Sequence, residues 1–252
     1  MFEPTAPSVD DEATENEKGS VRRLMLARRG SRRPHERERL SYDLASRALE
    51  EFEGCTTVAA YVSYDSEPGT IPLIEELHAS GVRILVPKLG PGLSREWAWY
   101  VSTEDLEVRA PGRPPEPSGD ALGTDALSLA DAVLVPALAV DIAGIRLGRG
   151  AGWYDRALLH RRPGTPAYAT VFDDEFLVDR TLPRDSHDVP VTHVLMPSRT
   201  IELSPETLKQ EILDQFAPLR RPGSDRDEPT GDQSGRRGRG SRGQAEPEAR
   251  VS

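Results

Sequence analysis

Apolar residues follow a helical period in the first part of the chain. Within residues 17–29, Val21, Leu24 and Met25 recur at near-helical spacing among arginines, and a second helical pattern runs over 34–52. Pro34 opens this second pattern, and proline suits the first turn of a helix because its missing N–H would be unpaired there. The pattern predicts two helices ahead of the first strand.

Short apolar runs then alternate with helical patterns. Residues 57–63 and 82–87 are β-rich, and a helical pattern over 71–80 that ends at Gly81 separates them. This order is a βαβ unit, which implies parallel strands with a right-handed crossover.

The apolar run 132–138 is continuous and bounded by turn signals, which is typical of a strand buried on both faces of a sheet. We expect it at the sheet centre. Further strands are expected at 97–101, 167–172 and 191–196, a Pro/Gly-rich loop at 110–123, and a closing helix at 205–216. The predicted fold is α/β, with three layers: an open, mostly parallel sheet flanked by helices in a single domain.

Composition separates the two ends of the chain from this domain. Residues 1–16 are acidic, and 218–252 contain almost no large apolar residues. Such segments bury too little surface to offset the entropy of ordering. We predict a disordered extension at 1–16, an α/β domain at 17–217 and a disordered tail at 218–252. An Arg/Gly-rich stretch at 236–243 is interpreted as solvated, with RNA contact as the alternative.

Charge and cysteine content narrow the function. The formal net charge of -10 disfavours a nucleic-acid binder, because phosphate recognition needs a basic surface. The single Cys55 excludes an internal disulfide and a multi-cysteine zinc site. Neither a run of about 20 apolar residues nor a signal-peptide pattern is present, so we expect a cytoplasmic protein without membrane contact.

A glycine-rich segment at 144–155 carries the chemistry. Its glycines alternate with Arg146 and Arg149, and Asp155 ends it. Glycines let backbone N–H groups approach an anion, arginine forks bind phosphate or carboxylate, and a carboxylate suits Mg²⁺ beside phosphates. The alternative is a plain turn whose arginines pair with surface acids. The segment lacks the G-K-[ST] ending of a Walker A loop and the placement of a dinucleotide fingerprint.

The pattern P-x-x-x-x-D-x-x-G-x-R-L-G-x-G-x-G-[YW]-Y-D at 136–155 resembles the signature of 5-formyltetrahydrofolate cyclo-ligases. Three other places agree with it. Lys18 and Arg22 match the family's nucleotide-binding pair, Glu67 its folate-pocket acid, and His187-Asp188 its H-D ending. Taken alone, the first pair would be a solvated basic face, and Glu67 an ordinary loop acid.

The resemblance implies ATP-dependent conversion of 5-formyltetrahydrofolate to 5,10-methenyltetrahydrofolate, with ADP and phosphate released. It implies Mg²⁺ held by Asp155 and Asp188, catalysis by Arg149 and Arg146, and a folate pocket formed by Glu67, Val62, Trp153 and Tyr154. The implied ATP-binding residues are Lys18, Arg22, Arg146, Leu147, Gly148, Arg149, Gly150, Gly152 and Tyr154.

The chain departs from the family pattern at three positions. Trp153 stands where tyrosine is usual, Val140 where an aromatic residue is common, and Thr192 where the strand often begins with aspartate. Tryptophan keeps a flat stacking surface but has no hydroxyl to donate or accept a hydrogen bond.

Two rival hypotheses remain open. One is a non-catalytic relative that binds nucleotide or, through its basic tail, RNA. The other is a different small-molecule kinase or ligase, because a fold and a phosphate site do not specify the acceptor. We expect a monomer whose partners are ATP and a reduced folate.

Overall fold

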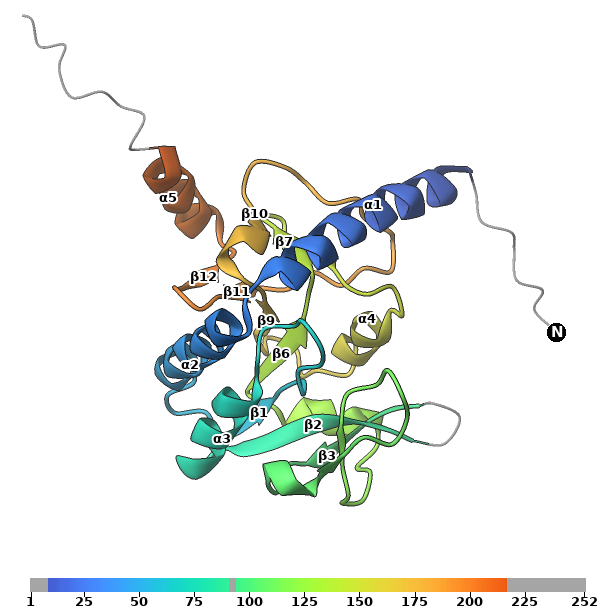
Figure 1. Ribbon diagram of the computed structural model, residues 1–252, viewed down its shortest axis with the longest axis vertical. Helices are drawn as coiled ribbons and strands as arrows, with labels where there is room; N and C mark the ends of the chain where they lie inside the picture. The colour runs from blue at the N-terminus through green and yellow to red at the C-terminus, as the bar shows by residue number, and fades with distance from the viewer. Residues whose placement is uncertain (1–8, 91–93, 217–252) are drawn as a thin grey trace, which may run out of the picture. The chain divides into compact units, whose positions relative to one another are not determined.

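A seven-stranded sheet forms the centre of the protein, and it runs in the order β12-β11-β9-β6-β1-β2-β3 (Figure 1). The computed structural model describes residues 9–90 and 94–216. All pairs in this sheet are parallel except the edge pairs β2–β3 and β11–β12. The strands are β1 (Thr57–Ala59), β2 (Arg83–Leu89), β3 (Arg95–Trp99), β6 (Ala132–Pro136), β9 (Ala167–Thr170), β11 (His193–Leu195) and β12 (Thr200–Glu202).

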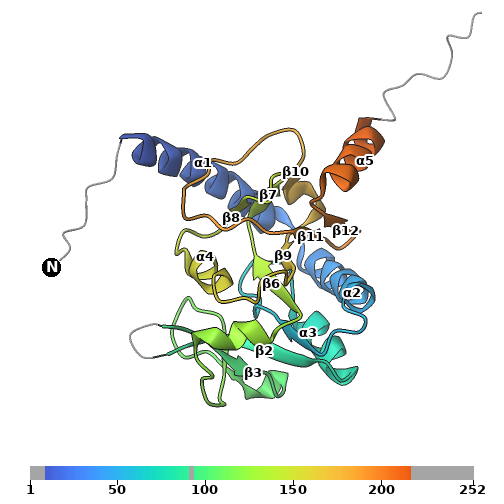
Figure 2. The same cartoon turned by 180° about the vertical axis from the view of Figure 1, so that it is seen from behind.

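Helices cover both faces of the sheet, as Figures 1 and 2 show from opposite sides. The helices are α1 (Val9–Ser31), α2 (Pro34–Glu51), α3 (Ile71–Ala79), α4 (Trp153–Leu158) and α5 (Pro205–Phe216). Successive strand residues alternate between faces: Val58 packs with residues of α2 and α3, whereas Ala59 packs in the cluster that includes residues of α4. The predicted three-layer α/β class is therefore confirmed.

The predicted central strand and βαβ unit are also confirmed. β6 is the fourth strand of the seven, and its residues Ala132 to Val135 are all buried. β1 and β2 pair in parallel on either side of the α3 crossover. Parallel strands that are buried on both faces consist of continuous apolar runs, so the central strand could be predicted from the sequence.

A small second sheet includes the first part of the glycine-rich segment 144–155. β7 (Ala139–Asp141) and β8 (Arg146–Leu147) form an antiparallel hairpin, and β10 (Phe176–Leu177) pairs with β7. Gly144 turns the hairpin with φ 76°, and a Cβ there would lie 2.4 Å from the carbonyl oxygen of Val191. Its glycine is thus required by backbone packing. The remaining short strands are β4 (Leu106–Glu107) and β5 (Glu116–Pro117).

The first helix begins earlier than expected. α1 starts at Val9, so the described helix includes residues 9–16 of the predicted extension. Acidic side chains suit the N-terminal turns of a helix, and Glu15 Oε1 lies 2.6 Å from Arg22 Nη1. Residues 1–8 and the predicted tail at 218–252 lie outside the described residues, whose compact unit extends to Gln215. No helix in 9–90 or 94–216 is long and apolar enough to cross a membrane.

Candidate functional site

A cavity of about 440 Å³ lies where β6, β1 and β2 end and where the chain enters α4. Ligands of open α/β sheets bind at such carboxyl ends of strands. Most of the predicted site residues line the cavity, namely Val62, Glu67, Arg146, Gly148, Arg149, Gly150, Gly152, Trp153, Tyr154 and Asp155. Lys18, Arg22, Leu147 and Asp188 are not among its lining residues.

The glycine-rich loop forms one side of the cavity. Gly150 has φ 104° and Gly152 has φ 57°, conformations that side-chain-bearing residues rarely adopt. Gly152 directly precedes α4, whose first residue is Trp153. The loop backbone is therefore bare of side chains at both positions, which leaves room for a ligand close to the main chain.

Arg149 and Glu67 meet across the cavity. The Arg149 Nε donates a 3.2 Å hydrogen bond to Glu67 Oε1, and the other Glu67 oxygen accepts a 3.0 Å bond from the Tyr64 backbone N–H. Asp65 lies 3.5 Å from Arg149 Nη2. The Glu67 side chain is 9% exposed and that of Arg149 is 41% exposed. The acid is held in place, whereas the guanidinium keeps access to solvent.

Arg146 is more deeply placed. Its Nη2 lies 2.7 Å from Asp155 Oδ1, and its Nη1 donates a 2.6 Å bond to the carbonyl oxygen of Val189. The Val189 N–H in turn donates to Asp155 Oδ1 at 3.1 Å. Burial lowers the pKa of Arg146, and the carboxylate of Asp155 opposes that change. Arg146 therefore connects β8, α4 and the segment before β11.

Lys18 lies between two carboxylates. Its Nζ is 2.6 Å from Asp185 Oδ2 and 2.8 Å from Asp188 Oδ2, and the Asp185 N–H also donates to Asp188. Burial acts to lower the pKa of Lys18, but the two aspartates outweigh it and the net pKa is raised. Burial acts to raise the pKa of Asp188, and bonds from Lys18 and the Asp185 backbone bring the net pKa below its ordinary value.

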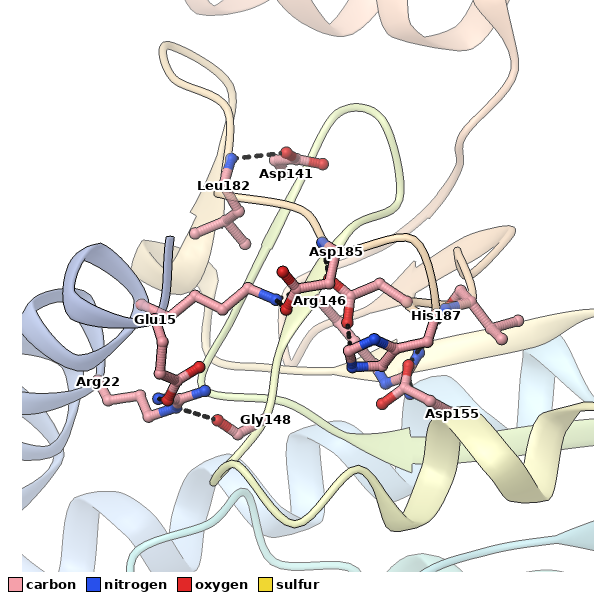
Figure 3. Close-up of polar contacts among 12 residues, drawn as sticks. Glu15, Arg22, Asp141, Arg146, Gly148, Asp155, Leu182, Asp185 and His187 are labelled. Carbon is pink, nitrogen blue, oxygen red and sulfur yellow. Dashed lines mark hydrogen bonds and ion pairs between the residues drawn. The ribbon is translucent and has the colours of Figure 1, made fainter. Parts of the chain in front are cut away.

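The acids near Lys18 form a candidate cation site. Ligand atoms of Asp185, His187 and Asp188 all lie within 4.8 Å of one another. The structure thus groups Asp188 with Asp185 and His187, whereas Asp155 contacts Arg146. Figure 3 shows Arg146, Asp155, Asp185 and His187 in one view of this region. Sequence reasoning missed Asp185, although it stands in the same short segment as the His187-Asp188 pair.

Arg22 connects α1 with the glycine-rich loop. Its Nε donates a 3.0 Å hydrogen bond to the Gly148 carbonyl oxygen, and its Nη1 pairs with Glu15 (Figure 3). Lys18 and Arg22 therefore share a helix face, as their spacing predicts, but contact different partners.

The remaining predicted residues differ in how they lie. The Leu147 side chain is 2% exposed and packs with Met25 in a small core cluster, so only its backbone can reach a ligand. Trp153 contacts Tyr154 and also Trp97, with ring centroids 4.6 and 5.4 Å apart. Burial and the nearby Glu67 carboxylate raise the pKa of Tyr154, which keeps its hydroxyl neutral.

Two buried charged residues, Arg29 and Asp141, were given no role in the site by the sequence reasoning. Arg29 is fully buried, lines the cavity, forms a bidentate pair with Glu175 at 2.7 Å and donates to the Ala137 carbonyl oxygen at 2.5 Å. Asp141 accepts bonds from the backbone N–H groups of Ala143, Ile145 and Leu182. Arg29 is one of several arginines on α1, so only its tertiary contacts distinguish it.

Comparison with known proteins identifies the family of the chain. The model of the 5-formyltetrahydrofolate cyclo-ligase family matches residues 14–197. The 5-formyltetrahydrofolate cyclo-ligase of Mycolicibacterium smegmatis is 43% identical over 150 residues, which cover 58% of this chain and 75% of that protein. The Escherichia coli K12 enzyme of the same name is 34% identical over 151 residues, which cover 58% of this chain and 80% of that protein.

A solved structure gives the same result. The Aquifex aeolicus 5,10-methenyltetrahydrofolate synthetase has a TM-score of 0.62 and 28% sequence identity, covering 74% of this chain and 92% of that one. The synthetase from Mycoplasma pneumoniae, at 17% identity and a TM-score of 0.56, shares the fold. The chain belongs to the 5-formyltetrahydrofolate cyclo-ligase family.

Proposed function

We propose that the protein is an ATP-dependent ligase that converts 5-formyltetrahydrofolate to 5,10-methenyltetrahydrofolate and releases ADP and phosphate. The observation that carries this proposal is the contact between Arg149 and Glu67 inside one cavity. A cation suited to phosphate, on the glycine-rich loop, meets there a half-buried acid suited to a nitrogen-rich ring. A reaction between a nucleotide and a pterin needs both groups in one place.

The proposed phosphate ligands are the cations of α1 and the glycine-rich loop: Lys18, Arg22, Arg146 and Arg149. Each has a carboxylate partner in this structure. Lys18 pairs with Asp185 and Asp188, and Arg22 pairs with Glu15. Arg146 pairs with Asp155, and Arg149 pairs with Glu67 and Asp65. Phosphate oxygens accept the same charge-assisted bonds as carboxylates. A bound polyphosphate can therefore exchange with these partners, most readily at the exposed Arg149.

Residues of this chain suit Mg²⁺. Magnesium prefers oxygen ligands, usually one or two carboxylates with waters and phosphate oxygens. Asp155 and Asp188 offer such oxygens, and Asp185 lies beside Asp188. The contacts of Asp155 with Arg146 and with the Val189 N–H both use Oδ1. When bound, Mg²⁺ would neutralise charge on the phosphates. This metal assignment rests on the donor set and on the family pattern.

The folate side of the site is proposed to consist of Glu67, Val62, Trp153 and Tyr154. Glu67 is anchored by the Tyr64 N–H, so its carboxylate can accept hydrogen bonds from the amino-substituted ring of a pterin. Val62 is 3% exposed and lines the cavity, and the two aromatic residues give it flat walls.

The proposed chemistry requires positioning more than covalent participation. The formyl oxygen of the substrate attacks the γ-phosphorus of ATP, and ADP leaves with the bonding electron pair. The neighbouring folate nitrogen then bonds to the formyl carbon and closes the ring. The phosphorylated oxygen departs as phosphate with the electron pair of its bond to carbon, and the nitrogen loses its proton to that phosphate. Arg149, which lies between two loop glycines, is the residue that we propose stabilises charge on the transferring group.

The test is an absorbance assay of purified protein with 5-formyltetrahydrofolate and Mg²⁺, with and without ATP. Growth of the near-ultraviolet methenyl band only in the presence of ATP is the expected result, with loss of the signal in Asp155→Ala and on chelation of the metal. A folded protein that binds ATP but gives a flat trace would contradict the folate assignment and favour another acceptor. The cytoplasmic location and the monomeric state remain predictions.

A further inference from the structure

The cavity has a second cationic end that the proposed chemistry does not use. Its lining includes Arg95 at the start of β3 and Arg113 in the segment before β5. Both side chains are half-buried. Neither has an ion-pair partner within residues 9–90 and 94–216, which differs from the paired cations of the phosphate side.

The surroundings of Arg95 favour an anionic ligand. Its Nε is buried and has no hydrogen-bond partner among the residues that the structure describes. Burial, and then the neighbouring Arg156, lower the pKa of Arg95. An unpaired buried N–H and a like-charged neighbour each raise the free energy of this arrangement. A carboxylate bound to Arg95 would accept the free N–H and offset the repulsion.

The other charged groups nearby have partners of their own. Lys88 also lines the cavity, but its Nζ donates to the carbonyl oxygens of Pro117 and Gly119 at 2.8 and 2.6 Å. The buried Glu116 accepts a 3.3 Å bond from the Leu89 N–H. Lys88 and Glu116 thereby hold the segment that carries Arg113 against the end of β2.

The strand order places these arginines away from Lys18 and Arg22. The cavity spans the ends of β6, β1 and β2 and reaches the start of β3, and these four strands are consecutive in the sheet. Neighbouring strands lie about 4.8 Å apart, so β6 and β3 are separated by roughly 14 Å. Gly148 at the start of the loop contacts Arg22, whereas Gly152 at its end lies against Arg156, the neighbour of Arg95.

We propose that Arg95 and Arg113 bind the carboxylates of the glutamyl tail of the reduced folate, at the β2–β3 end of the cavity. This inference rests on the proposed function, because the tail belongs to that substrate. A folate ends in an amino acid with two carboxylates, and guanidinium groups bind carboxylates through paired hydrogen bonds. Glu67 then holds the pterin end, and the arginine pair sets the preference for a glutamylated substrate.

The test compares 5-formyltetrahydrofolate with 5-formyltetrahydropteroate, which lacks the glutamate. In Arg113→Ala we expect KM for the folate to rise roughly tenfold, with kcat and the KM for ATP unchanged. KM for the pteroate should be the same in the variant and the wild type. Arg109→Ala is the matched control, because Arg109 is an arginine of the same segment that pairs with Glu107 and is not a cavity-lining residue.

An equal KM rise for both substrates, or a rise in the KM for ATP alone, would overturn the proposal. Arg113→Lys should recover part of the affinity, and circular dichroism checks folding of each variant. If the wild type turns over neither substrate, the proposed function fails by itself. The tail site is then still tested by the Kd of each ligand, measured through intrinsic tryptophan fluorescence in the wild type and in Arg113→Ala.

Discussion

The two ends of the parallel sheet use charged residues differently. At the carboxyl ends of the strands, side chains from distant segments pair with one another, as Arg149 does with Glu67. At the amino ends, Asp131 accepts bonds from the Thr56 hydroxyl and from the backbone N–H groups of Thr56 and Thr57. Asp131 precedes β6 and Thr57 begins β1, so this carboxylate connects two neighbouring strands.

The difference shows which contacts a ligand can replace. A phosphate or carboxylate can substitute for an acid that pairs with a guanidinium, because the bonds have the same geometry. Nothing equivalent replaces Oδ2 of Asp131, which accepts bonds from two main-chain N–H groups at the start of β1. We therefore expect changes at the carboxyl ends to alter activity, and changes at the amino ends to alter stability.

The largest expected effect is beneath the cavity, at the fully buried pair of Arg29 and Glu175. Glu175→Ala should lower the free energy of unfolding by about 3–5 kcal/mol, because it leaves the Arg29 charge buried without a partner. Urea unfolding measures this. The double variant Arg29→Met with Glu175→Leu should be more stable than Glu175→Ala, because it leaves no unpaired buried charge. If both variants lost the same free energy of unfolding, the packing of these side chains and not their charge would explain the loss.

Arg149→Ala should reduce kcat roughly 100-fold, about 2.7 kcal/mol, as expected for loss of a donor to a transferring group. Its melting temperature should stay close to that of the wild type, since the side chain is 41% exposed. Arg162→Ala provides the control, because Arg162 pairs with Asp131 at the amino ends and should leave kcat unchanged. If Arg149→Ala kept the wild-type kcat at saturating substrates, the proposed catalytic role of Arg149 would be wrong.

Asp131→Ala should cost about 2 kcal/mol of stability, because it leaves several strand-end donors without their acceptor. Turnover below the melting transition should match the wild type. Thermal unfolding and the absorbance assay, run on the same preparation, separate these two quantities. A large loss of kcat with little loss of stability would erase the contrast between the ends of the sheet.

The smallest effect is a dependence on pH. Bonds from the Thr56 hydroxyl and the Thr56 N–H lower the pKa of Asp131 to about 2. Because this pKa is lower in the folded protein than in the unfolded chain, the ionised carboxylate stabilises the fold at pH values above the unfolded-state pKa. This contribution to stability is lost as the pH falls from about 4 to about 2. Because Asp131 is 31% exposed, solvent screening limits the contribution to about 1 kcal/mol. In Asp131→Asn, the free energy of unfolding should depend less on pH between about 4 and about 2. A pH dependence equal to that of the wild type would contradict this prediction.

The sequence alone determined the features that depend on local pattern. The run 132–138 specified a buried central strand, since only a strand covered on both faces needs uninterrupted apolar residues. The glycines and arginines of 144–155 predicted an anion-binding loop and indicated the family, which the family model over residues 14–197 confirms. Both depend on residues close together in the chain, where steric preferences and burial leave a periodic signal.

Only the tertiary structure decided which charges meet. It placed Asp185 beside Lys18, 167 positions earlier, and paired Arg29 with Glu175, 146 positions away. It also turned Gly144 into a hairpin residue whose absent Cβ makes room for a carbonyl oxygen. Contacts of this kind arise when the strands assemble, and a charged residue carries the same local signal whether its partner is solvent, another side chain or a ligand. For that physical reason, candidate site residues could be predicted from the sequence, but the side chains that they contact could not.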